Sequence, residues 1–454
     1  MSRTDDLAAR LDAQLAQTDA DLAARYPGDD GSRQPVHTVY VPADRFGASL
    51  VPEWGARALE EFTTHLSDPS TLAGVLDVGP LLAAEVAPLV AAKLEAEPIE
   101  DLRIDFEDGY GSRDDAVEDA DVDAALASWR SSRDGDGATP SRATPFSGIR
   151  IKSFEVLTRR RGLETLSRFV GGAVTDRRLP DGFVVTLPKV TAVAQVEAMV
   201  VACTHLEEEH RLAPGALRFE IQVETPQAVL LADGTAGVAR MIAAAGGRCT
   251  GLHYGTYDYS ASLGISAAQQ SMEHPVADHA RAVMQVAAAG TGVRLSDGST
   301  NILPVGDLEA RYAAWRLHAR LVRRSLDRGY YQGWDLHPAQ LPTRYAATFA
   351  FYRQGFGPAA RRLRAYVSRT ESGSGSGTGS GFLDEPATAR ALAWFVLRGL
   401  HCGAITDAEC REQAGLDRLA VERLAHPGRG APGPLKVRPP APPARQPIGS
   451  PDRR

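Results

Sequence analysis

The chain has 454 residues, of which 43% are hydrophobic, and a formal net charge of −7 at pH 7. This composition suits a large buried core, and the modest negative charge argues against a broad basic surface of the kind that binds nucleic acid. The four cysteines have no C-x-x-C spacing and fit a reducing cytosol. Because the chain shows neither a signal-peptide pattern nor a run of about 18 apolar residues, we expect a cytoplasmic protein that does not span a membrane.

The first predicted element is an amphipathic helix within residues 1–30. Leu7, Leu11 and Leu15 recur at helical spacing in an alanine-rich segment, and Tyr26-Pro27-Gly28 marks the helix end. We expect the apolar face of this helix to pack on the outside of the domain that follows.

Residues 31–370 alternate short β-rich runs with helix-length spacers. The expected strands are residues 37–41, 102–109, 148–152, 183–187, 217–223, 251–254, 301–305 and 333–336. Strands that each precede a helix predict an α/β fold with a parallel sheet, either a TIM (β/α)8 barrel or a doubly wound open sheet. The nucleotide-binding motifs G-x-G-x-x-G and G-x-x-x-x-G-K-[ST] are absent from their usual places, which favours the barrel.

The remainder of the chain predicts a small appendage. Residues 371–381 form a Gly/Ser run without apolar side chains, which indicates a flexible linker. Residues 382–426 form a helical appendage with helices expected at 385–400 and 407–424, and residues 427–454 are Pro-rich and basic, as in a disordered, solubilising tail. The predicted architecture is therefore a TIM barrel with an N-terminal helix and a small C-terminal helical appendage.

Charged residues gather at the carboxyl ends of several predicted strands, where TIM barrels carry their chemistry. They are Asp105, Glu107, Asp108, Arg150, Lys152, Lys189, Glu224 and Asp258. Glu224 and Asp258 follow neighbouring strands and are natural anchors for a hard divalent cation such as Mg²⁺. Structural ion pairs to Arg150 or Lys189 explain the same acids, and position alone leaves both interpretations open.

Several short motifs occur in a fixed order between residues 100 and 345. They are Ile104–Gly109, Ile149–Ile151, Leu187–Lys189, Val223–Pro226, Gly255–Tyr259 with Leu263-Gly264, and His337–Gln340. Together they resemble the HpcH/HpaI aldolase and citrate lyase beta-subunit superfamily of phosphoenolpyruvate- and pyruvate-binding TIM barrels, which includes relatives of malate synthase.

The resemblance implies a homo-oligomer with Mg²⁺, or alternatively Mn²⁺, on Glu224 and Asp258. It further implies that Glu107 and Asp108 lie beside the metal, where they orient water and the reacting group, and that Lys189 adds positive charge at the rim. The residues expected to bind substrate are Arg150, Lys152, Thr225 and Tyr257, with Arg150 on the carboxylate and keto oxygen of a 2-oxo acid.

The predicted activity is that of a Mg²⁺-dependent carbon–carbon lyase or aldolase. Its substrate is expected to be a small 2-oxo acid, or a citrate- or malyl-like acid, that reacts through an enolate; free acids and coenzyme A thioesters both stay open. One alternative makes Lys152 or Lys189 a Schiff-base nucleophile with a lowered pKa. Others are a phosphoenolpyruvate- or pyruvate-using transferase on the same barrel, and a metabolite-binding scaffold without turnover.

Overall fold

The computed structural model describes residues 3–134, 143–372 and 385–426. The chain divides into two compact units, Met1–Phe351 and Tyr352–Arg454, and the division falls within helix α13 (Leu341–Ser372). The predicted linker beyond Ser372 and the predicted tail from residue 427 lie outside the described residues, so these two predictions stay predictions.

The first unit contains an eight-stranded parallel barrel. Its strands are β1 (His37–Pro42), β2 (Asp101–Asp105), β3 (Phe146–Arg150), β4 (Phe183–Leu187), β5 (Phe219–Val223), β6 (Cys249–Tyr254), β7 (Arg294–Ser296) and β8 (Gly333–Asp335). Consecutive strands are neighbours from β1 to β7, and β8 pairs with β1. A bridge between Ser296 and Gln332 joins β7 to the β8 side, with Asp297 N donating to Gln332 O at 2.8 Å. The predicted TIM barrel is confirmed.

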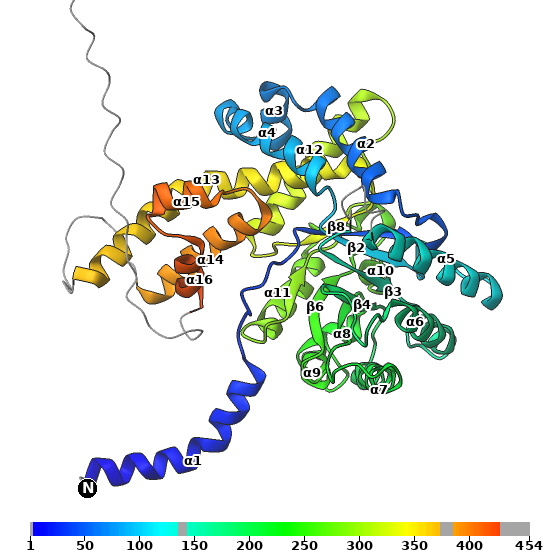
Figure 1. Ribbon diagram of the computed structural model, residues 1–454, viewed down its shortest axis with the longest axis horizontal. Coiled ribbons are helices and arrows are strands. Elements are labelled where there is room, and N and C mark those ends of the chain that lie inside the picture. The colour runs from blue at the N-terminus through cyan, green and yellow to red at the C-terminus, as the bar shows by residue number, and fades with distance from the viewer. Residues whose placement is uncertain (1–2, 135–142, 373–384, 427–454) are drawn as a thin grey trace, which may run out of the picture. The chain divides into compact units, whose positions relative to one another are not determined.

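The first unit also contains helices, most of which surround its strands (Figure 1). They are α1 (Arg3–Arg25), α2 (Leu50–His65), α3 (Pro69–Leu76), α4 (Pro80–Ala96), α5 (Asp115–Asp134), α6 (Arg159–Ala173), α7 (Val193–His210), α8 (Pro226–Val229), α9 (Gly237–Ala244), α10 (Thr256–Ser262), α11 (Pro275–Ala288) and α12 (Leu308–Asp327), with short 3-10 turns at Ala43–Arg45, Ala267–Gln269 and Pro338–Gln340. No single described helix has the length and apolar composition of a membrane span, and α3 and α4 reach those limits only as a pair bent by 102°.

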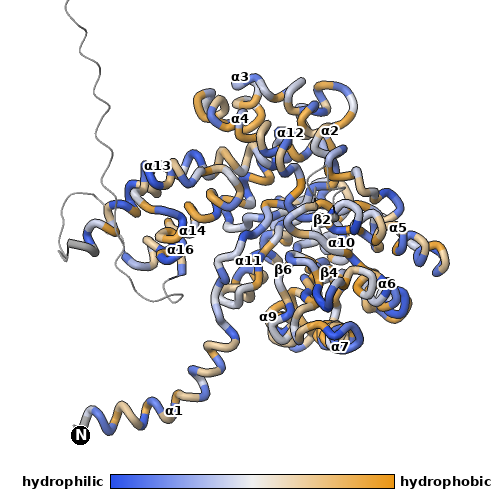
Figure 2. Tube along the Cα trace, viewed as in Figure 1, coloured by the Kyte–Doolittle hydropathy of each residue, from blue (hydrophilic) through white to orange (hydrophobic). Residues whose placement is uncertain are grey.

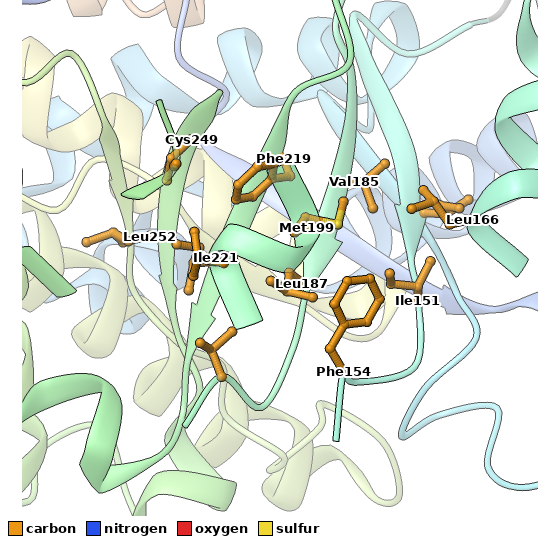
Figure 3. Packing of buried hydrophobic residues seen from close by; sticks show 14 of the residues in the cluster. Ile151, Phe154, Leu166, Val185, Leu187, Met199, Phe219, Ile221, Cys249 and Leu252 are labelled. Atoms are coloured by element: carbon orange, nitrogen blue, oxygen red, sulfur yellow. The ribbon is translucent and has the colours of Figure 1, made fainter. Parts of the chain in front are cut away.

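The apolar core of the barrel lies between its strands and the surrounding helices. Successive strand residues point to opposite faces, so Ile149 and Ile151 of the third strand segment face outward, as do Phe219 and Ile221 of β5. Figure 3 shows Ile151, Phe219 and Ile221 in this layer, together with Met199 of α7. Burial of this layer is the main favourable term that holds the helices on the barrel.

The inside of the barrel is polar, because the alternate residues on the same strands are charged. Arg103 of β2 donates to Glu220 of β5 through Nε and Nη2, at 3.0 and 2.9 Å. These strands are not neighbours, so the two side chains meet across the barrel interior. Glu220 also contacts His253 Nε2 at 2.9 Å, and Trp334 Nε1 donates to His253 Nδ1 at 3.1 Å. The buried charges of Arg103 and Glu220 therefore neutralise each other, as burial of charge requires.

The seventh strand differs from its predicted position. Residues 301–305 form no strand, and β7 is the shorter segment Arg294–Ser296, which pairs with residues 251–253 of β6. The predicted run was apolar, but Ile302 and Val305 are 53% and 46% exposed, and Pro304 has no backbone N–H for a ladder. The prediction was wrong because an apolar loop resembled a buried strand.

Helix α1 forms where predicted, but its expected packing on the barrel is wrong. All side chains described from Thr4 to Pro27 are exposed, including Leu7, Leu11 and Leu15. Figure 2 shows apolar and polar residues alternating along this helix. Helical spacing therefore predicted the helix correctly but not the exposure of its apolar face.

The second unit is helical. It contains the end of α13 with α14 (Pro386–Cys402), α15 (Asp407–Ala414) and α16 (Arg418–Ala425). Tyr352 and Phe395 pack with ring centroids 5.2 Å apart. The single helix predicted at 407–424 is broken, because Gly415 takes a left-handed conformation with φ 72° and Asp417 then caps α16 by accepting from Ala420 N at 2.8 Å.

Candidate active site

Three carboxylates meet at the carboxyl ends of the strands. Asp108 follows β2, Glu224 follows β5, and Asp258 lies in the first turn of α10 after β6; one oxygen atom from each lies within 4.8 Å of the others. Glu224 is buried, whereas the side chains of Asp108 and Asp258 are 48% and 43% exposed. Hard oxygen donors on one wall of a site open to solvent fit Mg²⁺, which prefers carboxylates and retains water.

Asp108 lies with the two predicted metal ligands in one group. The resemblance implied that it lies beside a metal held by Glu224 and Asp258, and the structure brings it into the same group as these two acids.

The carboxylate of Glu224 is fixed by two N–H donors. Its Oε1 accepts from Lys189 N at 2.7 Å and its Oε2 accepts from Gln222 Nε2. Gly255 makes room for it, since a Cβ there would lie 2.5 Å from Glu224 Cβ. Burial, together with the negative charges of Asp258 and Glu107, raises the pKa of Glu224 to about 8 against the opposing effect of Lys189. A bound cation would offset this repulsion.

Arg150, the last residue of β3, is locked against Asp105. Its Nε and Nη2 donate to the two oxygens of that carboxylate, each at 2.7 Å. Its Nη1 donates to Gln222 Oε1 at 3.2 Å, and the guanidinium lies over the Tyr40 ring, 4.9 Å from the centroid. Nη1 is 3.4 Å from Glu107 Oε2, so this nitrogen faces the acids. Asp105 is therefore a buried acid paired with Arg150.

Asp105 also shapes the turn that presents the next two acids. Its oxygens accept from Glu107 N and Gly109 N, both at 2.9 Å. A Cβ at Gly109 would lie 2.8 Å from Asp105 Oδ2, so the close approach of the backbone depends on glycine. One buried carboxylate therefore orients Arg150 and the acidic turn together.

Lys189 carries the positive charge closest to these acids. Its Nζ lies 2.5 Å from Glu107 Oε1, 2.6 Å from Asp108 Oδ1 and 3.8 Å from Asp258 Oδ2. Burial alone would lower the pKa of Lys189, but Glu224, Glu107 and Asp108 raise it above the ordinary value. A Schiff-base lysine needs a lowered pKa, so the raised pKa disfavours this alternative for Lys189.

Glu107 and Asp108 respond to this environment in opposite directions. Burial and the adjacent Asp108 raise the pKa of Glu107, although Arg150 and Lys189 oppose the rise. Burial also favours neutral Asp108, but its hydrogen bonds with Glu107 and Lys189 and the charge of Arg150 lower its pKa. Two neighbouring carboxyls with separated pKa values are an arrangement suited to proton transfer near neutral pH.

Lys152 does not take the inward position expected for a substrate-binding residue. Its Nζ lies 2.9 Å from Glu118 Oε2 of α5 and donates to Phe106 O at 2.7 Å and Gly111 O at 3.0 Å. The strand ends at Arg150, so strict alternation no longer applies two residues later. Lys152 fastens the turn after β2 to α5, and its buried pairing with Glu118 also disfavours it as a Schiff-base nucleophile.

The other two predicted substrate-binding residues are engaged with backbone. The Thr225 hydroxyl donates to Val190 O at 2.5 Å and accepts from Ala228 N at 3.2 Å, which caps α8. The Tyr257 hydroxyl accepts from Asn301 N at 2.7 Å and so holds the loop after β7. These contacts give both residues a role in positioning loops at the barrel mouth.

Sequence reasoning assigned no role to Gln222 or Tyr40, which both adjoin Arg150. Gln222 links Arg150 to Glu224, because its side-chain oxygen accepts from Arg150 Nη1 and its side-chain nitrogen donates to Glu224 Oε2. A row of polar residues at alternate positions of β5 was the available signal for Gln222. In the sequence, a tyrosine within an apolar strand such as β1 looks like an ordinary core residue, so no pattern pointed to a role for Tyr40 in the site.

Comparisons with known proteins place these observations in a family. A family model described as a domain of unknown function, DUF6986, matches residues 15–428. No curated protein sequence matches the chain.

Solved structures with a similar fold include the CitE protein of Mycobacterium tuberculosis with magnesium and acetoacetate (21% identity, 70% of this chain and 91% of that chain, TM-score 0.40). They also include the Haloferax volcanii malate synthase magnesium/glyoxylate complex (15% identity, 78% and 79%, TM-score 0.41). A third is an HpcH/HpaI aldolase/citrate lyase family protein from Burkholderia cenocepacia (16% identity, 72% and 94%, TM-score 0.35). The proteins that the motifs resemble are among these neighbours.

The family model covers nearly the whole chain, including the barrel, the charged strand ends and the helices of the second unit. The chain belongs to the DUF6986 family.

Proposed function

We propose that this protein is a Mg²⁺-dependent carbon–carbon lyase or aldolase. Its proposed substrate is a small 2-oxo acid, or a citrate- or malyl-like acid, that reacts through an enolate. The observation that carries the proposal is the meeting of Asp108, Glu224 and Asp258 within 4.8 Å on the side of the barrel where Arg150 presents its Nη1.

The chemistry needs positive charge where an enolate develops. Breaking or making a carbon–carbon bond next to a carbonyl leaves negative charge on the carbonyl oxygen, and a preorganised cation stabilises that charge. Asp108, Glu224 and Asp258 would hold the metal, which when bound would act as a Lewis acid toward the keto oxygen. Mn²⁺ has the same preference for oxygen ligands and is the alternative metal.

Arg150 is the proposed anchor for the substrate carboxylate. Because Asp105 holds Nε and Nη2, the guanidinium cannot rotate, and only Nη1 is directed toward the acids. The contact with Tyr40 supports the planar group from beneath. A fixed cation of this kind lowers the entropic cost of orienting a small acid.

Glu107 is the proposed carrier of the proton. Its pKa is raised toward neutrality, and its Oε2 lies 3.4 Å from Arg150 Nη1, next to the proposed carboxylate position. The carboxylate can therefore accept a proton at Oε2 and return it within one turnover. Its Oε1 lies 2.5 Å from Lys189 Nζ.

Enolate formation is testable before the natural substrate is known. Pyruvate in D₂O should exchange its methyl protons in the presence of protein and Mg²⁺, as followed by proton NMR, and chelation should abolish the exchange. Glu224→Gln should abolish it too, whereas Glu164→Gln on the exposed side of α6 is a matched control that should retain it. Exchange that survives both chelation and Glu224→Gln would refute the metal role.

The bond that is cleaved requires a second assay. A panel of 4-hydroxy-2-oxo acids, malate, citrate and the coenzyme A thioesters of the latter two should be screened for Mg²⁺-dependent release of a 2-oxo acid, glyoxylate or an acyl product. Cleavage within this panel supports the lyase proposal. Proton exchange together with an inert panel would restrict the proposal to enolisation of 2-oxo acids.

A further inference from the structure

The side chain of Lys189 occupies the space that the acids enclose. Its ammonium lies 2.6 Å from Asp108 Oδ1 and 3.8 Å from Asp258 Oδ2, and these residues supply two of the three carboxylates of the candidate metal site. It also lies 2.5 Å from Glu107 Oε1. The ammonium thus uses the oxygen-rich space that a divalent cation would use.

The backbone of Lys189 is held by a hydrogen bond, whereas its side chain is partly exposed to solvent. Lys189 has φ 51°, in the left-handed region that residues with a Cβ seldom adopt. Its N–H donates to Glu224 Oε1 at 2.7 Å, which holds this conformation in place. The side chain remains 23% exposed, so the four-carbon stem can turn toward solvent without a change in the loop.

An ammonium and a divalent cation compete for the same lone pairs. Their charges repel, and this repulsion is not fully screened at a site with one buried wall. Without a metal, however, three or more converging carboxylates repel one another and need a cation in their place. Lys189 meets that need as long as no metal is bound.

We propose that Lys189 is the resident counter-ion of the metal site and that a divalent cation binds by displacing its ammonium toward the barrel mouth. The inference rests on the metal site of the proposed function and gives one residue two tasks. The Lys189 backbone orients Glu224 in both states, and its side chain neutralises the acids only in the metal-free state. Metal affinity is thereby set in part by a cation built into the chain.

Metal titrations of side-chain variants test this exchange. Lys189→Met keeps the length of the stem and removes the charge, so Mg²⁺ and Mn²⁺ should bind about tenfold more tightly, or better, in calorimetric titrations at constant ionic strength. Lys189→Arg retains the charge and should bind no more tightly than wild type. Lys93→Met is the matched control, because Lys93 is also half-buried in ion pairs, with Glu97 and Glu100 before β2, at the opposite end of the barrel.

A chemical readout follows the ammonium itself. Acetylation of Lys189 by acetic anhydride, measured by mass spectrometry, should be several-fold faster with saturating Mg²⁺, since displacement exposes the amine and removes its carboxylate partners. Labelling of Lys93 should be unchanged. Labelling of Lys189 that Mg²⁺ slows or leaves unaltered would overturn the proposal.

The failure of this inference differs from the failure of the proposed function. If wild type binds Mg²⁺ and folded Lys189→Met binds it equally or less tightly, Lys189 is not a competing cation and the inference is wrong, while the metal site stands. If neither wild type nor Lys189→Met binds Mg²⁺ or Mn²⁺ at millimolar concentration, the metal site fails and the inference fails with it. Circular dichroism and thermal melts establish that each variant is folded.

Discussion

Metal binding should depend steeply on pH, because Glu224 must ionise to act as a ligand. Burial and neighbouring acids raise the pKa of Glu224 to about 8, so a cation that takes only the ionised form competes with one proton. For a single ionising group with that pKa, the apparent Kd for Mg²⁺ should exceed its high-pH limit by about 100-fold at pH 6, about 11-fold at pH 7 and about twofold at pH 8. Affinity therefore rises with pH and levels off above pH 9.

Calorimetric titrations at pH 6, 7, 8 and 9 measure this profile. Repeating the titration at pH 7 in buffers of different ionisation enthalpy should show release of about 0.9 proton per metal ion. A Kd that stays constant between pH 6 and pH 8, with no proton release, would refute the reasoning. Glu224→Gln should lose most of the affinity, and the weak binding that remains should lack the slope assigned to Glu224.

Three further predictions concern the support of the site. Gly255→Ala should weaken Mg²⁺ binding at least about tenfold in calorimetric titrations, because the new Cβ would lie 2.5 Å from Glu224 Cβ and displace this ligand. Gly251→Ala is the control, since its Cβ would meet only ordinary contacts from 3.4 Å, and it should bind Mg²⁺ normally. Asp105→Asn should lower the free energy of unfolding by about 3–5 kcal/mol in urea, since it leaves the buried Arg150 guanidinium without its carboxylate. Arg150→Lys should weaken oxalate binding about tenfold or more in the presence of Mg²⁺, because an ammonium cannot reproduce the fixed fork.

Each of these predictions has an outcome that contradicts it. Equal Mg²⁺ affinity in Gly255→Ala and Gly251→Ala would mean that metal binding does not depend on the position of Glu224. For Asp105→Asn, the reference is Asp44→Asn, which breaks a more exposed pair with Arg113 and should cost about 1 kcal/mol or less; equal losses would contradict the role of burial. Unchanged oxalate binding in folded Arg150→Lys would remove Arg150 as the anion anchor.

The barrel was predictable because each strand–turn–helix repeat can be recognised within a short stretch of sequence. Each long strand carries β-rich residues with a turn and a helix after it, and this pattern located seven of the eight strands. It failed for β7, where three residues Arg294–Ser296 form the strand and an apolar loop follows. Pairing with β6 decides this strand, and pairing is a tertiary property that a local window does not contain.

The site was predictable at the level of strand ends and less so at the level of contacts. Alternation placed Glu220, Gln222 and Glu224 on one face of β5, and the structure brings Glu224 to Asp258 as the ligand hypothesis requires. The same rule failed at Lys152, because β3 had already ended and the chain had turned toward α5. Side chains beyond a strand end are placed by loops, whose course depends on the whole fold.

The ion pairs within the site were the least predictable part. Arg150 was expected to bind substrate, and its use of two nitrogens on Asp105 could be anticipated only as one of several possible pairs. The position of Lys189 among the acids depends on a left-handed backbone that a lysine rarely adopts. These ion pairs and this backbone conformation are stabilised by residues of other strands, so the sequence around each residue does not predict them.

The most direct test of the account is a crystal structure of the protein with Mn²⁺ and oxalate, read by the anomalous scattering of manganese. We expect a single strong peak between the carboxylates of Asp108, Glu224 and Asp258, with one oxalate carboxylate on the metal and the other at Arg150 Nη1. Well-ordered crystals with Mn²⁺ at millimolar concentration and no peak among these three residues would contradict it.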